Sequence, residues 1–200
     1  MPDDVRHRKA TERKPRADAL RNRERVLEAA KSVFSSDDAT ASLEAVARRA
    51  GVGIGTLYRH FPTREALFEA VYRGEVEHLV EEADRLKADP APADALRRWM
   101  RANVAFVATK RGMTEALALA AHANSELSAY SFERLTRAVR ELLDRAVAAG
   151  QVRPDISAED IVRTLVGICL IQDGPGWLAN VLRLVDVFAD GLSTGRRTDV

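Results

Sequence analysis

Apolar residues recur at spacings of three and four along most of the chain, which is the spacing of amphipathic helices. One such stripe runs from Ala19 to Phe34, and another runs from Thr63, a helix-capping residue, to about Lys87. No segment alternates convincingly with the period of two that a half-buried strand shows. The pattern therefore predicts an all-α protein. Further helices are expected at about residues 93–109, 112–122, 125–149, 157–172 and 175–193.

Two short helices are predicted between these two stripes. Ser42 has the side chain of an N-cap, and the apolar face that follows it stops at Gly51. After a Gly-Val-Gly turn, residues 54–60 form the second short helix, which ends at Phe61 because Pro62 disfavours α geometry in the residue before it. Two short helices joined by a glycine-containing turn indicate a helix-turn-helix, whose second helix enters the DNA major groove.

Charge divides the chain unequally, although the formal net charge is only +1. Residues 1–64 hold 14 Lys/Arg and 9 Asp/Glu, whereas residues 65–200 hold 17 and 21. A cation density of this kind suits phosphate contact or a solvated tail. Residues 1–17 have no apolar period, so we expect a disordered basic arm there.

Residues 42–67 resemble the TetR family of transcriptional regulators, and the resemblance is dense over about residues 20–72. In two places the chain departs from the family pattern: Gly53 stands where the family often has Ser, and no Gly precedes the first short helix. The residues that carry the resemblance are Ala47, Ala50, Gly51 and Val52, then Gly55, Leu57, Tyr58, His60 and Phe61, and finally Glu65 and Leu67.

The second short helix carries the polar chemistry expected at DNA. Hydroxyl, phenol and imidazole groups reach phosphates or base edges, and Arg59 is able to read guanine through two hydrogen bonds. Tyr58 has the alternative of packing against the first helix, while Leu57 and Phe61 are expected in the core. The predicted DNA-binding residues are Arg16, Arg21, Ser42, Gly53, Thr56, Tyr58, Arg59, His60 and Arg64.

The proline pair Pro90 and Pro92 is the clearest break in the chain, and it separates the predicted domains. We expect a disordered arm at residues 1–17, a three-helix DNA-binding domain at 18–64, a connecting helix at 65–88, a dimerisation and effector-binding domain at 89–195 and a tail at 196–200.

The resemblance implies that the second domain forms a homodimer through its last helices and binds a small-molecule effector. Residues 156–171 and 178–192 are apolar around more of their circumference than a one-sided surface helix needs, which favours a partner subunit over a monomer core. Aromatic and polar side chains that either line an effector pocket or fill the core are Trp99, Phe106, Met113, His122, Tyr130, Phe132 and Trp177.

Other classes of function lack support in the sequence. The longest apolar run, residues 161–171, is shorter than the roughly 18 residues of a membrane-spanning helix, and from the charged N-terminus we expect no secretory signal. We therefore expect a cytoplasmic protein without membrane contact. Cys169 lies in an apolar run and is interpreted as a buried hydrophobe rather than a reactive thiol. The glycines of residues 51–55 follow a helix, so they do not form a nucleotide-binding loop.

The four histidines are scattered, and no catalytic arrangement is recognisable, so we expect no metal, no cofactor and no enzyme activity. The sequence predicts a DNA-binding transcriptional regulator, a repressor that an effector releases from a palindromic operator in double-stranded DNA. The alternative is a helical protein–protein adaptor without DNA specificity.

Overall fold

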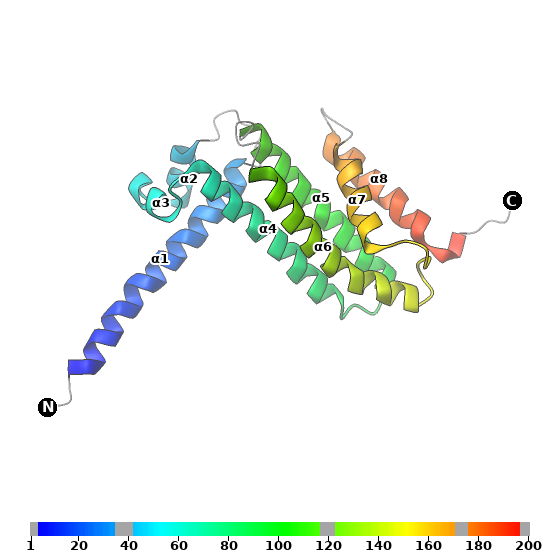
Figure 1. The fold of residues 1–200 in the computed structure, drawn as a ribbon, viewed down its shortest axis with the longest axis horizontal. Helices are drawn as coiled ribbons and strands as arrows, with labels where there is room; N and C mark the ends of the chain where they lie inside the picture. Colours follow the sequence, from blue (N-terminus) through cyan, green and yellow to red (C-terminus); the bar gives the residue numbers. More distant parts are fainter. Residues whose placement is uncertain (1–3, 35–41, 117–122, 171–175, 197–200) are drawn as a thin grey trace. The chain divides into compact units, whose positions relative to one another are not determined.

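The computed structural model describes residues 4–34, 42–116, 123–170 and 176–196, with side chains described for residues 18–34, 42–107, 126–170 and 176–195. In these ranges the chain is helical and has no strand longer than a single bridge between Val152 and Ser193, so the all-α prediction is confirmed (Figure 1). The helices are α1 (Asp4–Phe34), α2 (Leu43–Ala50), α3 (Ile54–His60), α4 (Arg64–Leu86), α5 (Pro92–Ala116), α6 (Ala123–Ala148), α7 (Ala158–Leu170), α8 (Trp177–Leu192) and the 3-10 turn Thr194–Arg196.

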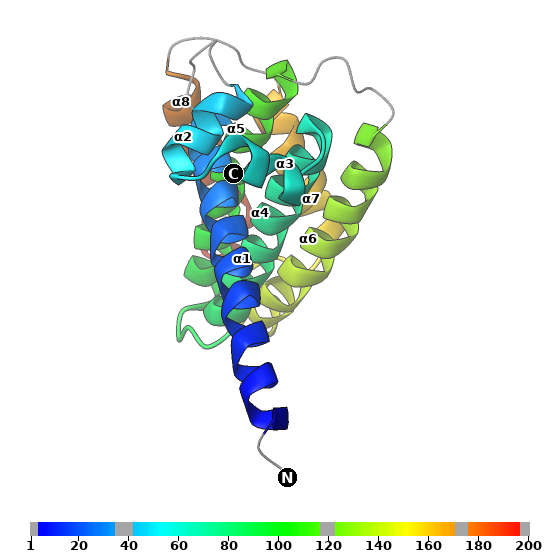
Figure 2. The same cartoon turned by 90° about the vertical axis from the view of Figure 1, so that its left-hand side faces the viewer.

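Helix α1 departs from the prediction, because it begins at Asp4 where a disordered arm was expected. Its first turns are rich in Arg, Lys, Glu and Ala, which are strong helix formers. A helix that is already nucleated by packed residues extends at little cost in free energy. Figures 1 and 2 both show this first half of α1 projecting away from α2 and α3.

Helix α5 is the second departure. Separate helices were predicted at about residues 93–109 and 112–122, but α5 continues through Gly112 to Ala116. A glycine inside a helix costs only about 1 kcal/mol relative to alanine, so flanking helix formers override it. The rest of the predicted helix at 112–122 lies outside the described residues.

The chain divides into two compact units. The N-terminal unit comprises residues 1–71 with 112–117, and the C-terminal unit comprises residues 72–111 with 118–200. The division falls between Val71 and Tyr72, inside α4, whereas the sequence pattern predicted that the DNA-binding domain ends at residue 64.

A single apolar core holds the N-terminal unit together. Small side chains let α1 and α2 approach closely, since Ala30, Ala47 and Ala50 are all buried at their contact. Leu57 of α3 is fully buried in the same core, and burial of a leucine stabilises a fold by about 2 kcal/mol. The remaining buried members are Val26, Ala29, Phe34, Val46, Phe61, Leu67 and Val71.

The C-terminal unit is built around Trp99, which is fully buried and donates a hydrogen bond from Nε1 to the carbonyl of Leu79 at 2.9 Å. Tyr72 donates to Ser131 at 2.8 Å, and burial raises the pKa of its phenol. Cys169 is buried as expected. Within the described ranges no helix is long and apolar enough to cross a membrane.

Candidate DNA-binding site

Helix α2 begins and ends at the residues that the sequence predicts. The Ser42 hydroxyl accepts a hydrogen bond from the amide of Ala45 at 3.1 Å, so Ser42 is the N-cap. Gly51 has φ = 64°, in the left-handed region, and its N–H donates to the carbonyl of Arg48 at 3.2 Å. The next amide, of Val52, donates to Ala47 at 3.0 Å. These bonds close the helix and turn the chain toward α3.

Helix α3 starts at an uncapped glycine and ends before a proline. Gly53 has extended backbone angles, φ = −69° and ψ = 146°, and its carbonyl accepts from the amide of Thr56 at 2.9 Å. Phe61 leaves the helix at φ = −136° and is buried in the core. The hydroxyl of Thr63 then accepts from the amide of Ala66 at 3.1 Å and caps α4 as predicted.

The side chains of α3 divide between the core and the solvent. Leu57 is buried, whereas Tyr58 is 44% exposed and Arg59 is exposed. Tyr58 therefore does not fill the core of the unit. Thr56 and His60 are half-buried, and the His60 ring lies 6.3 Å from the Phe61 ring. The helix thus presents a phenol and a guanidinium outward while one leucine anchors it.

Two of the predicted DNA-binding arginines have intramolecular contacts. Arg21 pairs with Asp18 on the exposed face of α1. The Arg64 guanidinium lies over the Phe34 ring, 5.9 Å from its centroid, a cation–π contact that directs it onto the core surface. Arg16 belongs to α1, but its side chain lies outside the described ones.

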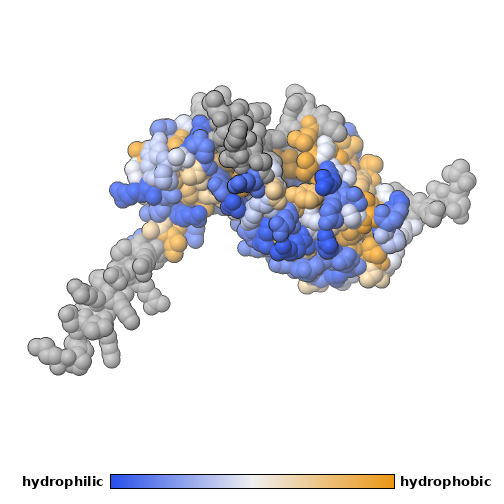
Figure 3. Space-filling model, in the orientation of Figure 1, coloured by the Kyte–Doolittle hydropathy of each residue, from blue (hydrophilic) through white to orange (hydrophobic). Residues whose placement is uncertain are grey.

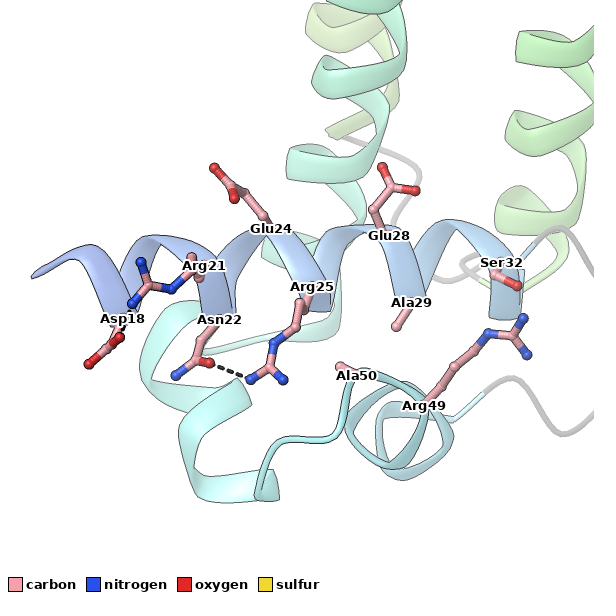
Figure 4. Close-up of a pocket in the computed structure, with 10 residues that line it drawn as sticks. All are labelled: Asp18, Arg21, Asn22, Glu24, Arg25, Glu28, Ala29, Ser32, Arg49 and Ala50. Atoms are coloured by element: carbon pink, nitrogen blue, oxygen red, sulfur yellow. Dashed lines mark hydrogen bonds and ion pairs between the residues drawn. The ribbon is translucent and has the colours of Figure 1, made fainter. Parts of the chain in front are cut away.

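A groove of about 1000 Å³ runs along α1 and reaches the end of α2 (Figure 4). Arg25 extends into it and donates to Asn22 at 2.5 Å, and one of its guanidinium nitrogens lies 3.8 Å from the point that a Cβ on Gly51 would occupy. Arg25 and Arg49 are not among the predicted DNA-binding residues, because nothing in their spacing distinguishes them from solvated arginines. The lining residues are Asp18, Arg21, Asn22, Glu24, Arg25, Glu28, Ala29, Ser32, Arg49 and Ala50.

The predicted effector-pocket residues have separate neighbours in the C-terminal unit. Trp99 and Phe106 are buried in the core, and the Phe106 ring packs 5.2 Å from Tyr72. Phe132 lies under the guanidinium of Arg163 at 4.8 Å. The described contacts therefore do not assemble one pocket from these residues, and the pocket stays a prediction.

The other four residues of that set are Met113, His122, Tyr130 and Trp177. Trp177 donates from its indole nitrogen to the carbonyl of Cys169 at 3.2 Å. Tyr130 donates to Glu77 at 2.6 Å, so its hydroxyl is engaged with α4. Met113 and His122 lie outside the described side chains.

Comparison with known proteins identifies both units. Residues 26–71 match the family model of bacterial regulatory proteins of the tetR family, and residues 91–194 match the C-terminal domain of SbtR-like transcriptional regulators. The chain belongs to the TetR family of transcriptional regulators. The fold of TetR-family members, with an N-terminal helix-turn-helix and a helical C-terminal domain, agrees with the elements described above.

Solved TetR-family structures align with nearly their whole length. The TetR regulator SCO0520 of Streptomyces coelicolor is 43% identical with a TM-score of 0.75, over 86% of this chain and 98% of that protein. A TetR regulatory protein of Mycobacterium vanbaalenii is 36% identical with a TM-score of 0.69, over 89% and 98%. Among curated relatives, the HTH-type regulator SAB2452 of Staphylococcus aureus is 32% identical over 75 residues, which is 37% of this chain and 40% of that relative.

Proposed function

We propose that this TetR-family chain binds double-stranded DNA sequence-specifically and regulates transcription by occupying an operator. The observation that carries the proposal is the outward face of α3: Tyr58 and Arg59 are exposed on a helix that Leu57 anchors in the core. A second helix held in this way is the element that helix-turn-helix proteins insert into the major groove.

The roles of the side chains follow from their chemistry. Arg59 offers the fork of donors that pairs with guanine, and Tyr58 and Thr56 offer hydroxyls to phosphates or base edges. Ser42, Gly53 and His60 lie on or next to the same two short helices and contribute backbone or side-chain contacts to phosphates. Arg16, Arg21 and Arg64 add positive charge, which supplies affinity for any sequence.

A homodimer is the second part of the proposal. Helices α7 and α8 carry exposed apolar residues, and Figure 3 shows hydrophobic atoms on the face of the C-terminal unit where α7 lies. A second copy covers such a surface and pairs two α3 helices for a palindromic operator. The exposed apolar residues are Val166, Leu170, Leu178, Leu184 and Val187.

Release by a small molecule completes the proposed mechanism. In one conformation of the dimer, the two α3 helices match successive major grooves, about 34 Å apart; in another they do not. An effector that binds the second conformation more tightly shifts the dimer population toward it and thereby releases the DNA. A hundredfold loss of operator affinity requires about 2.7 kcal/mol of differential binding. In this mechanism the chain acts as a repressor and needs no catalytic residue.

Fluorescence anisotropy with random and promoter-derived duplexes across a series of salt concentrations tests the DNA-binding part. We expect steep salt dependence together with a component that only some sequences show. Arg59→Ala should weaken the sequence-specific component, whereas Arg137→Ala should not, because Arg137 is an exposed arginine of the C-terminal unit. Absence of any sequence-dependent binding would instead favour the helical adaptor.

A further inference from the structure

Ile54, the first residue of α3, is exposed to solvent. Its side chain is 40% exposed, although α3 anchors itself through Leu57 and the chain then returns to the core at Phe61. An exposed isoleucine adds little to the stability of the fold, because most of its apolar surface stays in water. Core packing therefore does not account for the residue at this position.

The neighbours of Ile54 leave it accessible. Gly53 and Gly55 flank it, and a Cβ built on either glycine would meet no atom within 4 Å. Tyr58 follows four residues later, which places both side chains on one face of the helix. This face is therefore apolar and aromatic, with the Arg59 cation beside it.

An apolar side chain on a DNA-reading helix has one specific target in the major groove. Every base pair offers hydrogen-bond donors and acceptors there, which isoleucine cannot satisfy, and only thymine offers a methyl group. The first residues of a recognition helix are those that contact base edges. We propose that Ile54 is a specificity residue that packs against the C5-methyl group of a thymine in each half-site. The inference rests on the proposed DNA-binding function.

Two effects produce the selectivity. Contact with the methyl group removes apolar surface of both partners from water, which favours thymine. Placing Ile54 against the polar edge of another base leaves that edge without its hydrogen bonds to water, which disfavours the alternatives. The Arg59 cation and the basic character of the N-terminal unit favour DNA over an apolar protein partner at this face.

The test begins with a duplex that the full-length protein selects from a randomised pool. Each thymine is then replaced in turn by deoxyuridine, which lacks only the C5-methyl group, and affinity is measured by anisotropy. Loss of one buried methyl contact should weaken binding about fourfold per half-site, and about fifteenfold when both half-sites are changed. One thymine in each half-site should show this loss.

The Ile54→Ala protein should bind the thymine duplex more weakly than the wild-type protein by a similar factor. Replacing the thymine by deoxyuridine should then cause no further loss of affinity in this variant. Ile54→Val should keep most of the methyl preference. Leu20→Ala is the matched control, because Leu20 is the other exposed aliphatic residue described in the N-terminal unit, at 61%, and lies on α1. Circular dichroism melting of each variant verifies that it is folded.

The outcomes separate the two proposals. Methyl sensitivity that persists unchanged in Ile54→Ala, or that no thymine shows, overturns the role of Ile54 and leaves sequence-specific binding in place. If selection from the randomised pool enriches no duplex, both proposals are overturned. Enrichment of thymine at one position by the wild-type protein but not by Ile54→Ala supports the inference directly.

Discussion

The same substitution, glycine to serine, should have opposite effects at two sites of the turn between α2 and α3. Gly51 has φ = 64°, where an L-residue costs roughly 1–2 kcal/mol. A Cβ there would meet only the Arg25 guanidinium at 3.8 Å, an ordinary contact, so no steric penalty is added. Allowing for the smaller entropy of the unfolded chain, Gly51→Ser should destabilise the helix-turn-helix by about 1 kcal/mol.

Gly53 has the extended angles of an N-cap, φ = −69° and ψ = 146°, and open space around it. A serine there fits without strain and supplies the side-chain cap that α3 lacks. The side-chain cap stabilises the fold by a few tenths of a kcal/mol relative to glycine. Serine also lowers the conformational entropy of the unfolded chain, which stabilises the folded state further. Gly53→Ser should therefore stabilise the N-terminal unit by about 0.5 kcal/mol.

Amide hydrogen exchange measured by mass spectrometry is the suitable assay, since both tryptophans, Trp99 and Trp177, belong to the C-terminal unit and do not report on the turn. Peptides covering α2 and α3 should exchange about fivefold faster in Gly51→Ser and about twofold slower in Gly53→Ser. Peptides from α6 serve as the internal control. Equal effects of the two substitutions would refute the reasoning from backbone angles.

Three further predictions concern the C-terminal unit. The buried hydroxyl of Thr136 has no hydrogen-bond partner in the described part of the chain, so Thr136→Val should raise stability by about 1 kcal/mol in urea unfolding; an unchanged midpoint would contradict this. Hydrogen bonds from Arg134 and then Tyr130 hold the pKa of Glu77 below its usual value. The resulting stabilisation is present above the unfolded-state pKa and is lost as pH falls through the folded-state pKa. Glu77→Gln should therefore lower stability at pH 7 by no more than about 1 kcal/mol, because solvent screens this half-exposed pair, and the difference should shrink as the pH falls below 4.5, the ordinary pKa of this carboxyl; a constant difference would exclude the charged contact. Val187 is 62% exposed on α8, and a charge at this position should separate the proposed dimer. Val187→Glu should therefore halve the molecular mass measured by analytical ultracentrifugation, whereas an unchanged mass would argue against α8 as the dimer surface.

The boundaries of α2 and α3 were predictable because each is set by a local signal. Ser42, Gly51 and the Phe61–Pro62 pair fix the ends through a side-chain cap, a left-handed glycine and a proline. The extent of α1 and α5 was not predictable in the same way. Both contain residues that weaken a helix, and the balance between those residues and strong helix formers depends on the free energy of the whole element.

The candidate site was predictable in its elements but not in its orientations. Ile54 was missed because a seven-residue helix is too short for its apolar period to separate a core position from an exposed one. The position of Arg64 over Phe34 depends on the packing of α1 against α4, which a local pattern does not contain. The effector pocket was the least predictable feature, since aromatic residues of core and pocket have the same spacing.

Hydroxyl-radical footprinting on a duplex that the protein selects from a randomised pool tests the central claim most directly. A homodimer that reads DNA with two α3 helices should protect two symmetric patches whose centres lie about one helical turn, roughly 34 Å, apart. The patches should disappear with Tyr58→Ala at equal protein concentration. A single unpaired patch, or no protection of any selected duplex, would contradict the account.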